Sequence, residues 1–122
     1  MSDLLGDKAV HAVIVYRDTV NSDKIREIDM SIKQKAIMRR NLRIIIHVFS
    51  NKDNPLYFEE LRDIVLNNIS LTLAIMHYNL SVSEFKKLLE KLPREDTIVF
   101  IQKNLPEFVE KTQLLGYEPH IF

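Results

Sequence analysis

The sequence predicts a mainly α-helical domain, a compact bundle of five to seven helices formed by residues 1–122 as a single unit. The chain has only two glycines, and a glycine-poor sequence makes few of the tight hairpins that an all-β fold requires. Apolar and basic residues separate on a helical wheel drawn for residues 23–49. Pro55, Ser81 and Pro106 each stand where a helix characteristically begins. Together these three observations favour helices.

The longest predicted helix runs from about Asp23 to Phe49, with Ser22 as its N-cap and a stop at residues 53–55. At 100° per residue one half of the wheel is apolar and the other half is basic, with Ile32, Ala36 and Ile46 as exceptions. The apolar half holds Met30, Ile37, Met38, Leu42, Ile44, Ile45, Val48 and Phe49, and the basic half holds Lys33, Lys35, Arg39, Arg40 and Arg43.

The end of this segment, residues 42–49, is rich in β-branched residues and could form a strand on propensity alone. Its three consecutive isoleucines, Ile44 to Ile46, give no alternation between two faces, so the helix is preferred. Residues 9–16 and 97–101 are short apolar runs whose pattern does not distinguish a helix from a buried strand. They leave room for one or two short strands.

The remaining helices follow from their start and stop signals. Pro55 opens a helix that reaches about Asn67, and a shorter helix opens near Ser70. Residues 81–84 form a capping box that begins the next helix, which ends at Pro93. Pro106 opens the last helix, which has Gly116 at its C-cap.

Composition excludes several classes of site. The absence of cysteine removes disulfides, thiol nucleophiles and thiolate zinc sites, and two glycines cannot supply a phosphate-binding loop. His11, His47, His77 and His120 are scattered without a metal-ligand motif. We therefore predict no metal, no cofactor and no enzymatic activity. Since no segment approaches the roughly 20 apolar residues of a membrane span or resembles a signal peptide, we predict a cytoplasmic protein without membrane contact.

A zero net charge hides one strongly basic segment, because residues 31–52 hold six basic side chains and no acid. As a helix over 31–49, this segment could track a DNA backbone through Arg39, Arg40 and Arg43. Alternatively, it is a solvated face that pairs with the acidic Glu59, Glu60 and Asp63.

Residues 74–92 resemble the helix-turn-helix of DNA-binding regulators, and the ending LSVSEFKKLLEKL is similar to the first recognition helix of AraC-type regulators. In that arrangement Asn79 takes the positive φ of the turn and Ser81 caps the second helix. The resemblance implies DNA contacts from the turn and the exposed start of that helix, namely Asn79, Val82, Ser83, Lys86, Lys87 and Lys91. Any helical corner in a small bundle would show the same spacing.

Two functions remain. The first is a small DNA-binding transcription regulator that acts as a dimer, using a helix-turn-helix at residues 70–92 and a basic helix at 31–49. The second is a helical protein-interaction factor, an adaptor or inhibitor of a larger machine, that makes no contact with nucleic acid. The neutral total charge favours the second function, whereas the basic segment and the capped turn favour the first.

Overall fold

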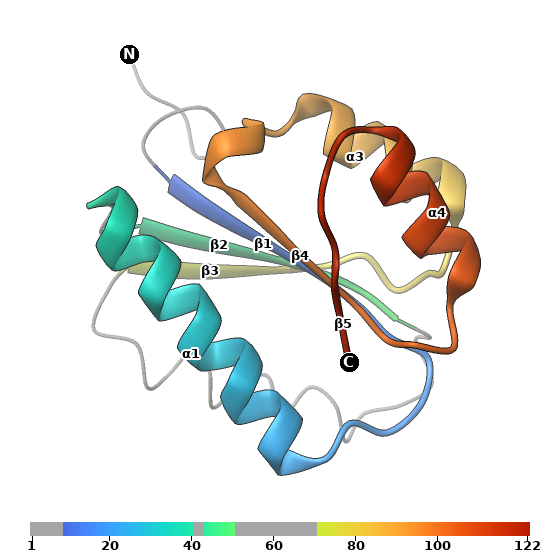
Figure 1. Ribbon diagram of the computed structural model, residues 1–122, viewed down its shortest axis with the longest axis horizontal. Helices are drawn as coiled ribbons and strands as arrows, with labels where there is room; N and C mark the ends of the chain where they lie inside the picture. Colours follow the sequence, from blue (N-terminus) through green and yellow to red (C-terminus); the bar gives the residue numbers. More distant parts are fainter. Residues whose placement is uncertain (1–8, 41–42, 51–70) are drawn as a thin grey trace.

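The computed structural model describes residues 9–40, 43–50 and 71–122. These residues form a five-stranded parallel sheet in the order β3-β2-β1-β4-β5, flanked by three α-helices (Figure 1). The strands are β1 (Ala9–Val15), β2 (Arg43–Phe49), β3 (Leu71–Met76), β4 (Thr97–Ile101) and β5 (His120–Ile121). The helices are α1 (Ser22–Arg39), α3 (Val82–Lys91) and α4 (Pro106–Leu114), and a single 3₁₀ turn, η1, covers Arg94–Asp96. The protein is therefore an α/β fold, and the prediction of an all-α bundle is wrong.

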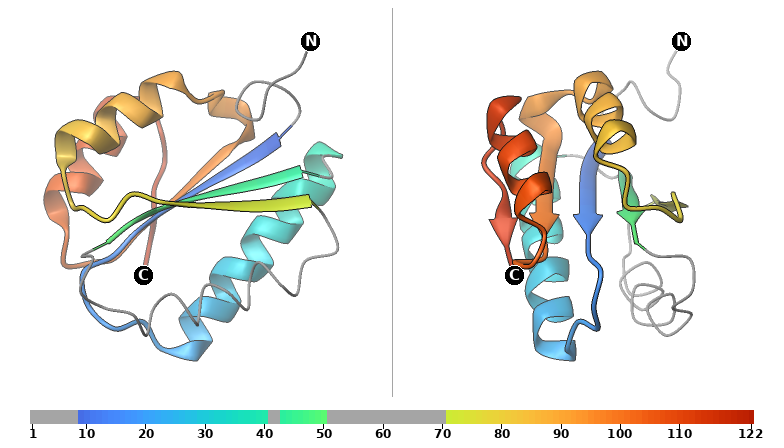
Figure 2. Two further views of the ribbon diagram at one scale, coloured as in Figure 1. Left: turned by 180° about the vertical axis from the view of Figure 1, so that it is seen from behind. Right: turned by 90° about the vertical axis from the view of Figure 1, so that its right-hand side faces the viewer.

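The chain builds the sheet outward in two directions from β1. Strands β1, β2 and β3 follow one another to one edge, and the chain then returns to place β4 on the other side of β1 and β5 beyond it. Helix α1 lies on one face of the sheet, and α3 and α4 lie together on the other face (Figures 1 and 2). The strand order thus reverses between β1 and β4, which is the topological switch point of a doubly wound sheet.

The predicted helix over residues 23–49 is wrong in its second half, which forms strand β2. Helix α1 ends at Arg39, where Arg40 takes a left-handed conformation with φ 55° and caps the helix through its backbone N–H. The chain then resumes as β2, in which Ile44, Ile45 and Ile46 are all buried. A central parallel strand is covered on both faces and needs no alternation, so consecutive isoleucines are what such a strand requires. The basic helix over 31–49 therefore does not exist as one element.

The face of α1 that contacts the sheet is also opposite to the predicted one. Ile28, Ile32 and Ala36 are buried against β1, β2 and β4 in the first core cluster. The N-cap is Asn21 rather than Ser22, and its side chain accepts a hydrogen bond from the Lys24 N–H. Two of the three exceptions on the predicted wheel thus belong to the true buried face.

The second core cluster lies between the sheet and helices α3 and α4. Phe85 and Leu89 of α3 and Phe108 of α4 pack on Val13 and Phe49. Residues 9–15 and 97–101, which the pattern left ambiguous, are both strands. Half of the predicted capping box is confirmed, because the Ser81 hydroxyl accepts from the Glu84 N–H at 3.2 Å. The Ser81 N–H donates to the Asn79 side chain and not to Glu84.

The last helix begins as predicted, but its C-cap is Leu115 and not Gly116. Pro106 is at the start of α4, and Gly116 follows its end with φ 86°. The predicted helix over residues 55–67, together with Glu59, Glu60 and Asp63, lies outside the described residues. No helix in the described part of the chain has the length and apolar content to cross a membrane.

Candidate functional site

The predicted helix-turn-helix does not form as a pair of helices. Residues 71–76, expected to be its first helix, are strand β3, and only the second helix, α3, is present. The residue with positive φ in the turn is Tyr78, at 56°, and not Asn79. Asn79 instead holds the turn through its side chain, which donates to the His77 carbonyl at 2.9 Å and accepts from the Ser81 N–H at 3.1 Å.

The two predicted sets of DNA-binding residues lie on different parts of the fold. Ser83, Lys87 and Lys91 are exposed on α3, and Val82 and Lys86 are half-buried there. Arg39 and Arg40 stand at the end of α1, on the opposite face of the sheet (Figure 1), and Arg43 begins β2.

The predicted arginines do not form a free basic strip. The Arg39 Nε donates a hydrogen bond to the Asp96 carboxylate at 2.6 Å, and the Glu95 carboxylate lies 3.8 Å from the guanidinium. The hydrogen bond to Asp96 raises the pKa of Arg39. This ion pair ties the end of α1 to η1. The charge of Arg39 is therefore already matched within the protein.

The switch point between β1 and β4 is the usual ligand crevice of a doubly wound sheet. Here the Gln102 side chain crosses it. Its Oε1 accepts from the backbone N–H groups of Arg17 at 2.8 Å and Asp18 at 2.9 Å, and its Nε2 donates to the Asp18 carbonyl at 3.1 Å. Asn104 also donates a hydrogen bond to the Asp18 carboxylate. The backbone N–H groups that would donate to an anionic ligand here thus already donate to the Gln102 side chain.

Three histidines form a stacked row on the α3 and α4 side of the sheet. His11 of β1 and His47 of β2 are each 1% exposed, and His77 follows β3 directly. The His47 ring stacks on both neighbours, with ring centres 5.5 Å from His11 and 5.9 Å from His77. The Nδ1 atom of His11 lies 3.2 Å from the Nε2 atom of His47, but no group of three side chains that could hold a metal ion occurs among the described residues. The row is therefore a core feature.

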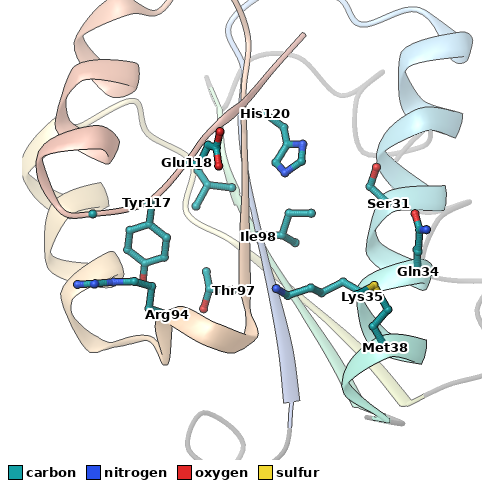
Figure 3. A pocket seen from close by; sticks show the side chains of 12 residues that line it. Ser31, Gln34, Lys35, Met38, Arg94, Thr97, Ile98, Tyr117, Glu118 and His120 are labelled. Atoms are coloured by element: carbon teal, nitrogen blue, oxygen red, sulfur yellow. The ribbon is translucent and has the colours of Figure 1, made fainter.

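A groove of about 410 Å³ runs along the edge of the sheet beside β4 (Figure 3). Strand β5 pairs only with Phe100 and Ile101, so the first half of β4 forms the floor of the groove. One wall is α1, and Lys35 reaches from it toward β4 (Figure 3). The residues that line the groove are Ser31, Gln34, Lys35, Met38, Arg94, Thr97, Ile98, Val99, Gly116, Tyr117, Glu118 and His120.

The outward face of α1 carries an apolar stripe made of Met30, Ile37 and Met38. Their side chains are 69%, 76% and 73% exposed. Positions 30, 37 and 38 fall on one side of a helix, opposite Ile28, Ile32 and Ala36. The helical wheel of residues 23–49 places these three residues in its apolar half, together with residues of β2. The i, i+4, i+8 spacing of Ile28, Ile32 and Ala36 is a sequence signal that α1 has a second apolar side.

The chain matches no protein-family model, no curated protein and no solved structure.

Proposed function

We propose that this chain is a non-catalytic protein-binding domain that engages its partner through the outward face of α1. The observation that carries the proposal is the stripe of Met30, Ile37 and Met38, three large apolar side chains that are each more than two-thirds exposed. Scattered apolar residues on a surface need no explanation, but a contiguous stripe marks a contact surface. Two of the three are methionines, whose flexible thioether side chains adapt to a partner's shape.

The energetics favour covering this stripe. Burying one large apolar side chain contributes roughly 1.5–3 kcal/mol before the cost of association is subtracted. The stripe has the exposed Gln34 between its two methionines and is flanked by charged side chains such as Arg26 and Glu27, which are also exposed. An apolar centre with a polar rim is the usual composition of a protein–protein interface.

The switch point supports a binding module over a small-molecule enzyme. The Arg17 and Asp18 N–H groups already donate to Gln102 Oε1, so a ligand at this crevice would first have to displace Gln102. Such a displacement leaves the Gln102 amide in need of new partners and costs about 1–3 kcal/mol.

The charge arrangement supports a protein partner over DNA. A DNA-binding surface needs several unpaired cations along one face. Here Arg39 pairs with Asp96, and Lys87 lies 3.9 Å from Glu84 on the other side of the sheet. DNA binding remains the competing hypothesis, and it would depend on the other predicted cations, Arg40, Arg43, Lys86 and Lys91.

Methionine oxidation measures whether the stripe is covered. Dilute hydrogen peroxide converts exposed methionines to sulfoxides, which mass spectrometry counts at each position. We expect Met30 and Met38 to oxidise rapidly in the dilute purified chain and to be protected in an extract of the cells that produce it. Met76, half-buried against the core, is the internal control and should change little between the two samples.

The matched variant is Ile37→Asp, which places a charge in the stripe and should abolish protection in the extract. Equal oxidation of Met30 and Met38 in both samples, and in the purified chain at high concentration, would overturn the proposal. A mobility shift of duplex DNA at low salt that is lost in an Arg40→Ala, Arg43→Ala variant would support DNA binding instead.

A further inference from the structure

We infer that the partner on the outward face of α1 is a second copy of this chain, with the two α1 helices packed antiparallel about Gln34. The inference rests on the function proposed above, because it names the molecule that covers the stripe. It follows from the spacing of the stripe, the distribution of charge along α1 and the length of the helix.

The spacing is symmetric about Gln34. Met30 precedes it by four residues and Met38 follows it by four, and all three side chains point outward. In an antiparallel pair with its two-fold axis at Gln34, Met30 of one copy lies opposite the partner's Met38, and the reverse contact is identical. Ile37 then packs next to the same pair. The stripe on one copy is thus complementary to the same stripe on the second copy.

The charge along α1 selects the antiparallel orientation. Residues 22–30 contain three acids and two bases, for a net charge of −1, whereas residues 31–40 contain four bases and no acid, for +4. Parallel helices would place the two basic halves side by side and repel. The acids of the first half are already paired, Asp23 with Arg26, Glu27 with Lys24 and Asp29 with Lys33. Antiparallel helices therefore separate the two basic halves and also oppose the two helix dipoles. The neutralisation of Arg39 by Asp96 reduces this contrast without reversing it.

The groove beside α1 extends the surface that a second copy can contact. Gln34 and Met38 belong both to the outward face and to the groove wall, so the two features are continuous. A side chain from the partner that passes over Met38 therefore meets an open hollow rather than a filled surface.

The length of α1 limits the strength of the pair. Eighteen residues span about 27 Å, and a helix is about 10 Å wide. Its footprint is thus on the order of 300 Å² per copy, well below the roughly 800 Å² per partner of a standard stable interface. We therefore expect a weak, reversible dimer that forms only at high protein concentration.

Sedimentation equilibrium of the purified chain tests self-association directly. Between about 10 μM and about 1 mM, the average mass should rise from 14.4 kDa toward twice that value. Ile37→Asp should raise the dissociation constant at least about tenfold while leaving the circular dichroism spectrum unchanged. A mass that stays at 14.4 kDa over this range overturns the inference.

Single cysteines test the orientation, because the natural chain has none. On mild oxidation Gln34→Cys should form a disulfide-linked dimer, and Gln113→Cys, at an exposed position on α4, reports random collision. A mixture of Met30→Cys and Met38→Cys chains should cross-link mainly as the mixed pair. Predominance of Met30 to Met30 cross-links would indicate parallel helices and overturn the antiparallel arrangement.

The oxidation assay separates this inference from the proposed function. Protection of Met30 and Met38 that grows with the concentration of the purified chain supports both. Protection in the cell extract together with no self-association overturns the second copy as partner and leaves a different protein on the stripe. Exposure under every condition overturns both proposals.

Discussion

The Nδ1 atom of His11 lies 3.2 Å from the Nε2 atom of His47, and both rings are buried beneath the sheet face that carries α3 and α4. A hydrogen bond between neutral imidazoles requires that one ring donates and the other accepts. Burial, together with the neighbouring His11 and His77, lowers the pKa of His47 to about 3, and burial also lowers the pKa of His77. Folding therefore favours the neutral form of His47 and His77.

The stability of the fold should decrease in acid. Because the ordinary pKa of 6.5 applies in the unfolded chain and about 3 applies to folded His47, the unfolded state binds more protons between these values. The free energy of unfolding is then highest above pH 6.5 and falls as the pH is lowered, by up to about 1.4 kcal/mol per pH unit for one histidine. Urea unfolding at a series of pH values measures this slope. His47→Phe should flatten it, and an unchanged slope would mean that His47 does not titrate on unfolding.

Removing the side chain that spans the switch point should destabilise the protein. Gln102→Ala leaves two partly buried backbone N–H groups, those of Arg17 and Asp18, without their acceptor, at a cost of about 1–3 kcal/mol. Gln113→Ala on α4 removes an exposed glutamine and should change stability by less than about 0.5 kcal/mol. Equal effects of the two substitutions, measured by urea unfolding, would show that the Gln102 bonds contribute nothing.

Glycine should have opposite effects on the free energy of unfolding at Tyr78 and Asn79, the two neighbouring positions in the turn before α3. Tyr78 has φ 56° and is 56% exposed, so Tyr78→Gly should be neutral or stabilising, whereas Tyr78→Val should cost about 1–2 kcal/mol. Asn79→Gly loses two side-chain hydrogen bonds and should destabilise by about 1 kcal/mol. The reverse ranking in thermal or urea unfolding would place the strained residue at Asn79.

The ends of several elements could be predicted from the sequence because local chemistry decides them. Ser81 caps α3, Pro106 begins α4 and Gly116 follows its end with a positive φ, and each of these roles depends on only a few neighbouring residues. Strands β2 and β3 could not be predicted in this way. Their stability depends on pairing with residues far away in the chain, as when His11 aligns with Ile45. Ile44 to Ile46 satisfy a helical wheel and a doubly covered strand equally well, and only the neighbouring strands decide between them.

The candidate surface was missed for a related reason. A wheel drawn through residue 49 included strand residues such as Ile45 and Val48, which pulled the apparent apolar centre toward Met30 and Ile37. A wheel limited to residues 22–39 has two apolar sides, because Ile28, Ile32 and Ala36 oppose Met30, Ile37 and Met38. Sequence alone does not say which of two apolar sides meets the sheet.

Two isoleucines five residues apart on α1 test that assignment. Ile32 is fully buried between the helix and the sheet, so Ile32→Ala should cost about 2–5 kcal/mol of unfolding free energy through lost burial and the cavity left behind. Ile37 is 76% exposed, and Ile37→Ala should change the stability of the dilute monomer by less than about 0.5 kcal/mol. The same Ile37→Ala variant should nevertheless weaken self-association, because its side chain packs only when a second helix covers it. Urea unfolding at low concentration and sedimentation at high concentration measure the two effects separately. A large loss of monomer stability in Ile37→Ala would place that residue in the core and remove the stripe from the surface.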